Sequence, residues 1–186
     1  LYKVLAALLI SPLLGFVAGM VLTWFALQLS KDKEDPGSSS QPHPKLMRWL
    51  HILSSASVSF SHGSNDGQKT MGIITLILAT HFAQFGYTIN DVPLWVKAGA
   101  ATAIALGTVI GGWRVIRTVG TKISRERLSH AQGFGASMST AMIIMVASAI
   151  GAPISTTHTL SSAVAGGTIP MHGAEKLNPK TLKLIV

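Results

Sequence analysis

From Ala131 to Ile169 the chain contains no aspartate, glutamate, lysine or arginine. This feature restricts the fold most, because a stretch of this length has no charged face to turn toward water. Over all 186 residues, 48% are hydrophobic and 12% are charged, whereas an ordinary soluble domain has about 25% charged residues. The composition excludes a disordered chain and does not suit a soluble enzyme domain. It predicts an all-α membrane protein, a polytopic helical bundle.

Apolar and polar segments alternate along the chain and predict its organisation. In order, they are a transmembrane helix at 1–29, a polar linker at 30–45, an apolar segment at 46–81, a short loop at 83–93, a span at 94–113, a basic segment at 114–130, the charge-free segment at 131–169 and the start of a further span at 178–186. Residue 1 is Leu, and the last apolar run stops soon after it starts. We therefore interpret the chain as an internal piece of a longer membrane protein.

The charge-free segment is expected to fold back on itself. Gly151 and Pro153 lie in its middle, and both residue types interrupt helices. The second piece, of roughly 14 residues, is too short for a comfortable independent span. We predict a re-entrant helical hairpin over 131–169 with its tip inside the membrane; the alternative is one span followed by a partly buried loop.

A second interruption is predicted within 46–81. Gly63 and Gly67 flank Ser64, Asn65 and Asp66, and glycine permits non-helical backbone. We therefore expect a broken helix at membrane depth, where irregular backbone is tolerated only if it lines a cavity or is buried in protein. Two further glycine pairs, Gly15 with Gly19 and Gly107 with Gly111, have the spacing that allows helices to approach closely.

The basic residues indicate the orientation of the chain. Twelve of the fifteen lysines and arginines lie in segments 30–48, 114–130 and 170–183. With single crossings by the first three apolar segments and a hairpin at 131–169, these segments share one side, which the positive-inside rule assigns to the cytoplasm. The net charge of +8 therefore reflects topology, and we predict no nucleic-acid partner. The chain has no cysteine, which excludes disulfides and thiolate metal sites.

Asp66 is the one acidic residue of seven that falls outside the predicted loops. An ionisable residue at membrane depth usually marks an ion or substrate pathway; the alternative is a structural pair with His62 or Lys69. The second polar cluster, Ser155 to Thr157, follows the Gly–Pro break. If a half-helix starts there, its free N–H groups and the hydroxyls form an anion site.

Other chemistry is less well supported by the pattern. His62 and His158 could relay protons, but a structural hydrogen bond is the more common role of a buried histidine. The histidines lack metal-ligand spacing, so we expect no metal site built on them. Neighbouring Ser, His and Asp residues on one helix point about 100° apart, whereas a catalytic triad is assembled from separate elements. We therefore predict that the protein is not an enzyme, with no catalytic residue.

The two polar motifs together resemble a known family. Gly63 to Asp66, entered through Ser61 and His62, and Gly151 to His158 are similar to the second half of PiT-type inorganic phosphate transporters. That family has two inverted repeats, each with a Gly-x-Asn-Asp motif and a Ser/Thr-rich hairpin. The resemblance implies that 46–186 is the C-terminal repeat of an inverted-repeat transporter, that 1–29 precedes a cytoplasmic central linker, and that the first repeat is missing. One departure is Gly67-Gln68-Lys69-Thr70, where members often have Val-Ala-Asn-Ala.

The resemblance implies symport of inorganic phosphate with sodium ions or protons. The expected roles are phosphate binding by Ser155, Thr156, Thr157 and Asn65, cation coupling by Asp66 and Asn65, and accessory contacts by Ser64, Gln68, Lys69 and His158. A cation at Asp66 would remove the repulsion between two anions. Two rival functions remain open: a related oxyanion permease, for example for sulfate, and a non-transporting membrane subunit or receptor.

The expected partners follow from this function. They are phosphate, the lipid bilayer of a bacterial or archaeal cell, the missing first repeat and, as a candidate, a second copy in a homodimer. No cofactor is expected beyond the transported phosphate and its co-transported cation.

Overall fold

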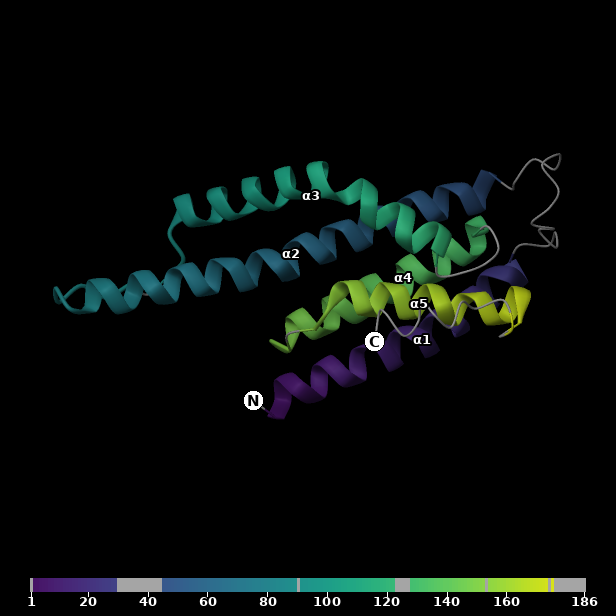
Figure 1. Cartoon of the computed structure of the whole chain (residues 1–186), viewed down its shortest axis with the longest axis horizontal. Coiled ribbons are helices and arrows are strands. Elements are labelled where there is room, and N and C mark those ends of the chain that lie inside the picture. The colour runs from purple at the N-terminus through teal and green to yellow at the C-terminus, as the bar shows by residue number, and fades with distance from the viewer. Residues whose placement is uncertain are drawn as a thin grey trace.

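The computed structural model describes residues 2–29, 45–89, 91–122, 128–152, 154–173 and 175. These residues form five α-helices and no strand: α1 (Tyr2–Leu29), α2 (Lys45–Ala83), α3 (Leu94–Lys122), α4 (His130–Ala149) and α5 (Thr156–His172), shown in Figure 1. The predicted all-α class is confirmed for this part of the chain. Apart from Lys45, the polar linker at 30–45 lies outside the described residues, as does the predicted span at 178–186.

The helices pack in a simple order. The hairpin of α4 and α5 is the centre, α1 packs along both of its helices, α2 packs on α4, and α3 packs on α2. Figure 1 shows α2 and α3 extending together beyond the end of the hairpin. The central contacts are made by small side chains, with Ala136, Ala163 and Ala165 all buried in one cluster. Small residues let helices come close, which favours their association in a membrane.

Among the described residues, two helical segments are long and apolar enough to cross a membrane. They are Ala7–Leu29 in α1 and Leu94–Arg114 in α3. Large apolar side chains on both helices point outward, for example Leu9 at 79% exposure and Ile110 at 83%. An outward-facing apolar surface of this kind suits a lipid environment and agrees with the membrane protein predicted from composition.

The first glycine pair brings α1 and α5 into backbone contact. A Cβ atom added at Gly15 would lie 2.5 Å from the carbonyl oxygen of Thr159, and one at Gly19 would lie 2.7 Å from the Cα atom of Ala163. The predicted close approach is therefore confirmed for this pair. Cβ atoms at Gly107 and Gly111 would meet nothing within 4 Å, so the second pair makes no such contact in the part of the chain that the structure covers.

The helical hairpin is confirmed at the predicted place. Helix α4 ends at Ala149 and α5 begins at Thr156, with Ser155 as its N-cap residue. Gly151 has a φ angle of +67°, a conformation that costs other L-residues energy because their Cβ atom crowds the backbone. Pro153 itself lies outside the described residues. Whether the hairpin tip lies inside a membrane stays a prediction.

Replacing Gly151 with alanine is expected to destabilise the hairpin by about 1–2 kcal/mol, because the Cβ atom of alanine disfavours the left-handed backbone conformation of this turn. A lower midpoint of thermal unfolding in detergent would show this. The matched control is Gly72→Ala, in the exposed part of α2 where an added Cβ meets nothing within 4 Å. Since alanine favours helix over glycine, the control should be neutral or stabilising. An unchanged midpoint in the Gly151 variant would contradict the prediction.

The predicted break in the second apolar segment is wrong. Helix α2 runs from Lys45 to Ala83 through both glycines, and neither Gly63 nor Gly67 has a positive φ angle. Glycine permits a break without requiring one. Serine hydroxyls along α2 instead donate to carbonyls one turn back, as Ser61 does to Ser57 at 2.8 Å, so these polar groups are satisfied inside a regular helix.

The predicted boundary between the span at 94–113 and the basic segment at 114–130 also needs correction. Helix α3 continues to Lys122, so the first part of the basic segment is helical.

Candidate functional site

A pocket of about 580 Å³ lies where α2, α3 and the hairpin meet. Its lining residues are Val58, Ser59, His62, Asp66, Ile104, Gly107, Thr108, Gly111, Gly112, Thr140, Ile144, Thr156, Thr157 and Leu160. The list joins Asp66 on α2 with Thr156 and Thr157 at the start of α5. The two polar clusters singled out in the sequence, ninety residues apart, therefore share one pocket, and the glycines of α3 form its opposite wall.

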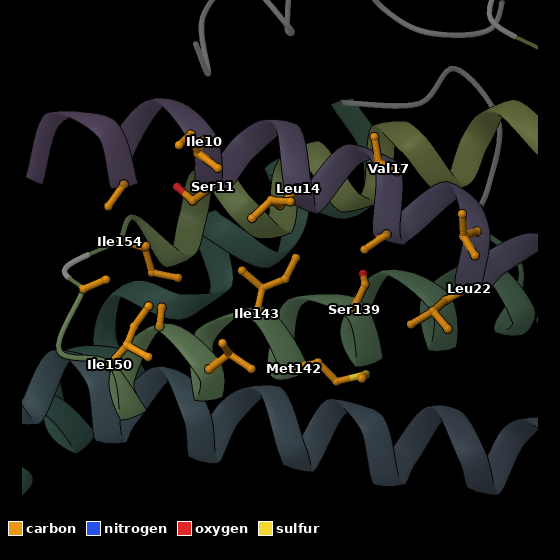
Figure 2. A pocket seen from close by; sticks show the side chains of 16 residues that line it. Ile10, Ser11, Leu14, Val17, Leu22, Ser139, Met142, Ile143, Ile150 and Ile154 are labelled. Carbon is orange, nitrogen blue, oxygen red and sulfur yellow. The ribbon is translucent and has the colours of Figure 1, made fainter. Parts of the chain in front are cut away.

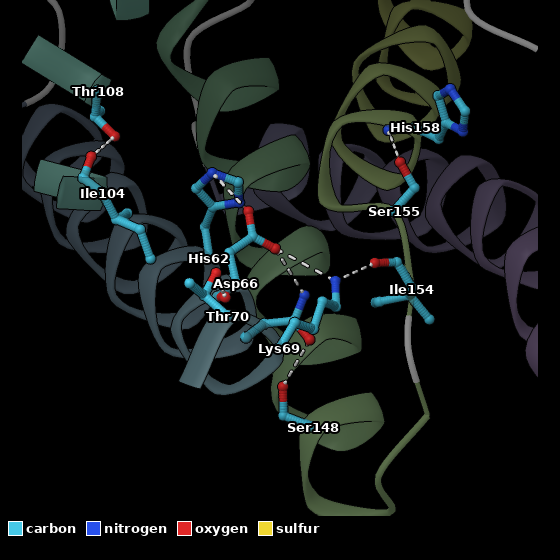
Figure 3. Close-up of polar contacts among 11 residues, drawn as sticks. His62, Asp66, Lys69, Thr70, Ile104, Thr108, Ser148, Ile154, Ser155 and His158 are labelled. Carbon is cyan, nitrogen blue, oxygen red and sulfur yellow. Dashed lines mark hydrogen bonds and ion pairs between the residues drawn. The ribbon is translucent and has the colours of Figure 1, made fainter. Parts of the chain in front are cut away.

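Asp66 is the centre of a polar network on one face of α2 (Figure 3). Its Oδ1 atom lies 3.3 Å from Nζ of Lys69, and its Oδ2 atom lies 3.6 Å from Nε2 of His62. Side chains three and four residues apart on a helix share a face, which explains why these three groups meet. The Asp66 side chain is 38% exposed, so ions and water can reach the carboxylate.

Lys69 also connects α2 to the hairpin turn. Its Nζ atom donates to the backbone carbonyl of Ile154 at 2.9 Å. Ile154 comes directly before Ser155, the N-cap residue of α5. The ammonium group therefore lies between the carboxylate of Asp66 and the segment that leads into the second polar cluster.

Asn65 occupies a different place from the one expected of a direct ligand. Its side chain is buried, at 3% exposure, and it is absent from the pocket lining. Its Oδ1 atom accepts a hydrogen bond from Ser148 of α4 at 3.4 Å, and its Nδ2 atom donates to Asp66 at 3.4 Å. In this structure Asn65 contacts Asp66 from the buried side of α2, away from the pocket. Its roles in binding phosphate and the cation remain predictions.

The first turn of α5 presents donors to the pocket. The hydroxyl oxygen of Ser155 accepts the N–H of His158 at 3.4 Å and so caps the helix. Thr156 is buried and Thr157 is exposed, and both line the pocket. The N–H groups of a first helical turn have no acceptor within the helix, and the helix dipole makes this end favourable for an anion.

The accessory residues are dispersed. Ser64 and Gln68 are exposed on α2 and do not line the pocket, and Figure 3 shows the ring of His158 pointing away from Asp66. Of the two histidines considered in the sequence, His62 lines the pocket and His158 does not. The sequence argument favoured only a structural hydrogen bond for His62. Its position four residues before Asp66, on the same face of α2, is the sequence signal that places it at the site. Across the described ranges, no group of three or more His, Asp or Glu residues could hold a metal ion.

A second pocket, of about 630 Å³, lies between α1 and α4 (Figure 2). Its lining is aliphatic apart from Met142 and the hydroxyls of Ser11 and Ser139, and it contains no charged side chain. Of these two pockets, the one beside α2 is lined by ionisable side chains, His62 and Asp66, and we take it as the candidate site.

The fold and the site define a class: a helical membrane protein with a charged, water-accessible pocket at the N-terminus of a helix. The sequence matches the phosphate transporter family over residues 1–186, and the chain belongs to that family. The predicted family resemblance is thereby confirmed. No solved structure matches the chain significantly.

Curated relatives agree with this assignment. Proteins named "Probable low-affinity inorganic phosphate transporter" are 42% identical over 164 residues in Bacillus subtilis, 38% over 172 residues in Rhizobium meliloti and 36% over 173 residues in Mycobacterium leprae. The matches cover 88%, 89% and 93% of this chain but 46%, 47% and 40% of the relatives. The chain thus spans about half the length of these relatives, whose names describe transporters and not enzymes.

Proposed function

We propose that the protein containing this chain carries inorganic phosphate across a membrane together with a cation, sodium or a proton. The observation that supports this most directly is the shared pocket of Asp66 and the first turn of α5. The family and the names of the relatives support phosphate as the substrate. The basic segments would face the cytoplasm, and alternating access would need a second repeat moving against this one.

Charge explains why the cation and phosphate should travel together. Phosphate and the carboxylate of Asp66 repel each other in a site that water screens only partly. A sodium ion or a proton at Asp66 removes this repulsion. Each ligand then raises the affinity for the other by the same factor, as thermodynamic linkage requires. This reciprocity is the physical basis that we propose for symport.

Phosphate would bind at the start of α5. The N–H groups and hydroxyls of Thr156 and Thr157 can donate to its oxygens, as helix N-termini do at anion sites in other proteins. Ser155, whose hydroxyl oxygen already caps the helix, would contribute through its O–H donor. Asn65 would act on Asp66 more than on phosphate, given its burial and its bond to the carboxylate.

The function is tested by uptake of labelled phosphate into proteoliposomes that contain the complete gene product. Sodium and pH gradients are imposed separately, and unlabelled phosphate or sulfate is added as competitor. Uptake that requires one of the gradients and is reduced by phosphate, not by sulfate, is the expected result. Preferential competition by sulfate would indicate the oxyanion permease. Absence of both uptake and phosphate binding would indicate a non-transporting subunit.

The double substitution Thr156→Val and Thr157→Val is expected to raise the KM for phosphate at least about tenfold. A hydrogen bond to a charged group contributes about 1.5–3 kcal/mol, and valine keeps the shape of threonine without the hydroxyl. The initial rate of uptake against phosphate concentration measures the effect.

The control for this pair is Thr102→Val in α3, away from the pocket, where the threonine hydroxyl is exposed and donates to the carbonyl of Ala98. The control should leave the KM unchanged. An unaltered KM in the double variant would remove these hydroxyls from the phosphate site.

A further inference from the structure

The ammonium group of Lys69 lies between two oxygen atoms, one on α2 and one in the turn that leads into α5. It is 3.3 Å from Oδ1 of Asp66 and 2.9 Å from the carbonyl oxygen of Ile154. Figure 3 shows this side chain extending from α2 toward the turn before α5. A carboxylate and a backbone carbonyl are also the ligands that hard cations prefer in proteins. Lys69 thus occupies a position that suits a small cation.

We propose that Lys69 is a tethered counter-cation that competes with the transported cation for Asp66. This inference rests on the transport function proposed above and adds a residue that sets how tightly the cation binds. While Lys69 pairs with Asp66, the carboxylate is already neutralised, so an incoming sodium ion or proton must displace the ammonium group. The apparent affinity for the cation is thereby lowered.

The exchange is energetically accessible. The side chains of Lys69 and Asp66 are each 38% exposed, and a pair exposed to this extent is stabilised by up to about 1 kcal/mol. Water can replace the ammonium group on the carboxylate at little cost. A cation that binds Asp66 would then free the positive charge of Lys69, which stays beside the pocket and favours the binding of an anion there.

The contact with Ile154 links this exchange to the other end of the pocket. Ile154 precedes the N-cap residue of α5, and the next residues, Thr156 and Thr157, line the pocket. When Lys69 leaves Asp66, the hydrogen bond that holds the turn against α2 loses its fixed geometry. Cation binding at Asp66 therefore alters the proposed phosphate site through the side chain of Lys69.

The test is the cation dependence of phosphate uptake by the complete protein carrying Lys69→Met or Lys69→Gln. Methionine removes the charge and the donor. Glutamine removes the charge and keeps an N–H donor for Ile154, so it separates electrostatic competition from attachment of the turn. We expect the half-saturating concentration of the coupling cation to fall about threefold in both variants, as loss of a partly exposed ion pair implies.

Lys97→Met is the matched control, since Lys97 is an exposed lysine near the start of α3, on a different helix from Asp66. It should leave the half-saturating cation concentration unchanged. If Lys69→Met does not fold, Lys69→Gln decides alone. An unchanged or higher half-saturating concentration in the glutamine variant would overturn the proposal, because a purely structural lysine would alter the maximal rate and not cation affinity. If the wild-type protein shows no cation-dependent uptake, the proposed function fails instead.

Discussion

Replacing Asp66 with asparagine is expected to reduce cation-coupled phosphate uptake by on the order of a hundredfold. Opposite unit charges about 4 Å apart attract by about 4 kcal/mol at an effective dielectric constant of about 20, and water at this partly exposed carboxylate reduces that value. Asparagine has nearly the same shape and still bonds its helical neighbours, so the helices should fold. Uptake in proteoliposomes with an imposed sodium or pH gradient measures the loss, and circular dichroism checks the helical content.

Asp91→Asn is the control for this substitution. Asp91 is an exposed acidic residue in the connection between α2 and α3, so the same chemical change is made away from the pocket. Uptake by the control should equal that of the wild type. If the Asp66 variant also kept normal uptake with the same cation dependence, Asp66 would have no part in coupling.

Replacing Gly19 with alanine is expected to destabilise the bundle by about 1–3 kcal/mol, the usual cost of overpacking. The new Cβ atom would lie 2.7 Å from the Cα atom of Ala163 and closer still to its carbonyl oxygen. Both atoms belong to backbone, which cannot rotate away, so α1 must move off α5. The midpoint of thermal unfolding in detergent should fall by several degrees.

Gly99→Ala provides the comparison. Gly99 lies on the exposed side of α3, and an added Cβ there meets nothing within 4 Å. Alanine is the better helix former by about 1 kcal/mol, so this variant should be as stable as the wild type or more so. Equal midpoints for the two variants would show that contact between the backbones of α1 and α5 adds nothing to stability.

The hairpin could be predicted from the sequence because the residues that specify it act on their own backbone. Gly151 adopts the conformation that glycine alone favours, and Ser155 is a good helix N-cap. A residue type that strongly prefers one backbone state specifies that state wherever it occurs. The position of the turn and the first turn of α5 could therefore be placed from the chain alone.

The continuity of α2 could not be predicted in the same way. Gly63 and Gly67 allow both a break and a helix, and the choice depends on where the polar side chains find partners. His62, Asp66 and Lys69 find them within two helical turns of one another. Spacing in the sequence permits these pairs, but the sequence does not exclude partners on other helices.

Sequence patterns could not predict the contacts between residues that are far apart in the chain. The bond from Lys69 to the carbonyl of Ile154 joins residues 85 positions apart, and that from Ser148 to Asn65 joins residues 83 apart. Both depend on how α2 lies against α4, which no local preference encodes. The choice of Asp66 as the important acid rested on its hydrophobic context and on the motif from Gly63 to Asp66. The burial of Asn65 could be seen only in the packed structure.

The two walls of the site pocket are attached to the rest of the chain very differently. Helix α5 touches α1 through backbone at Gly15 and Gly19, whereas the extensive packing of α3, within the described residues, is on α2. Displacing α5 would pull apart backbones in contact, and displacing α3 would separate one helix pair. The pocket therefore has an anchored side that carries the anion donors and a compliant side lined by Gly107 and Gly111. A change in the width of the pocket therefore requires the least free energy when α3 moves.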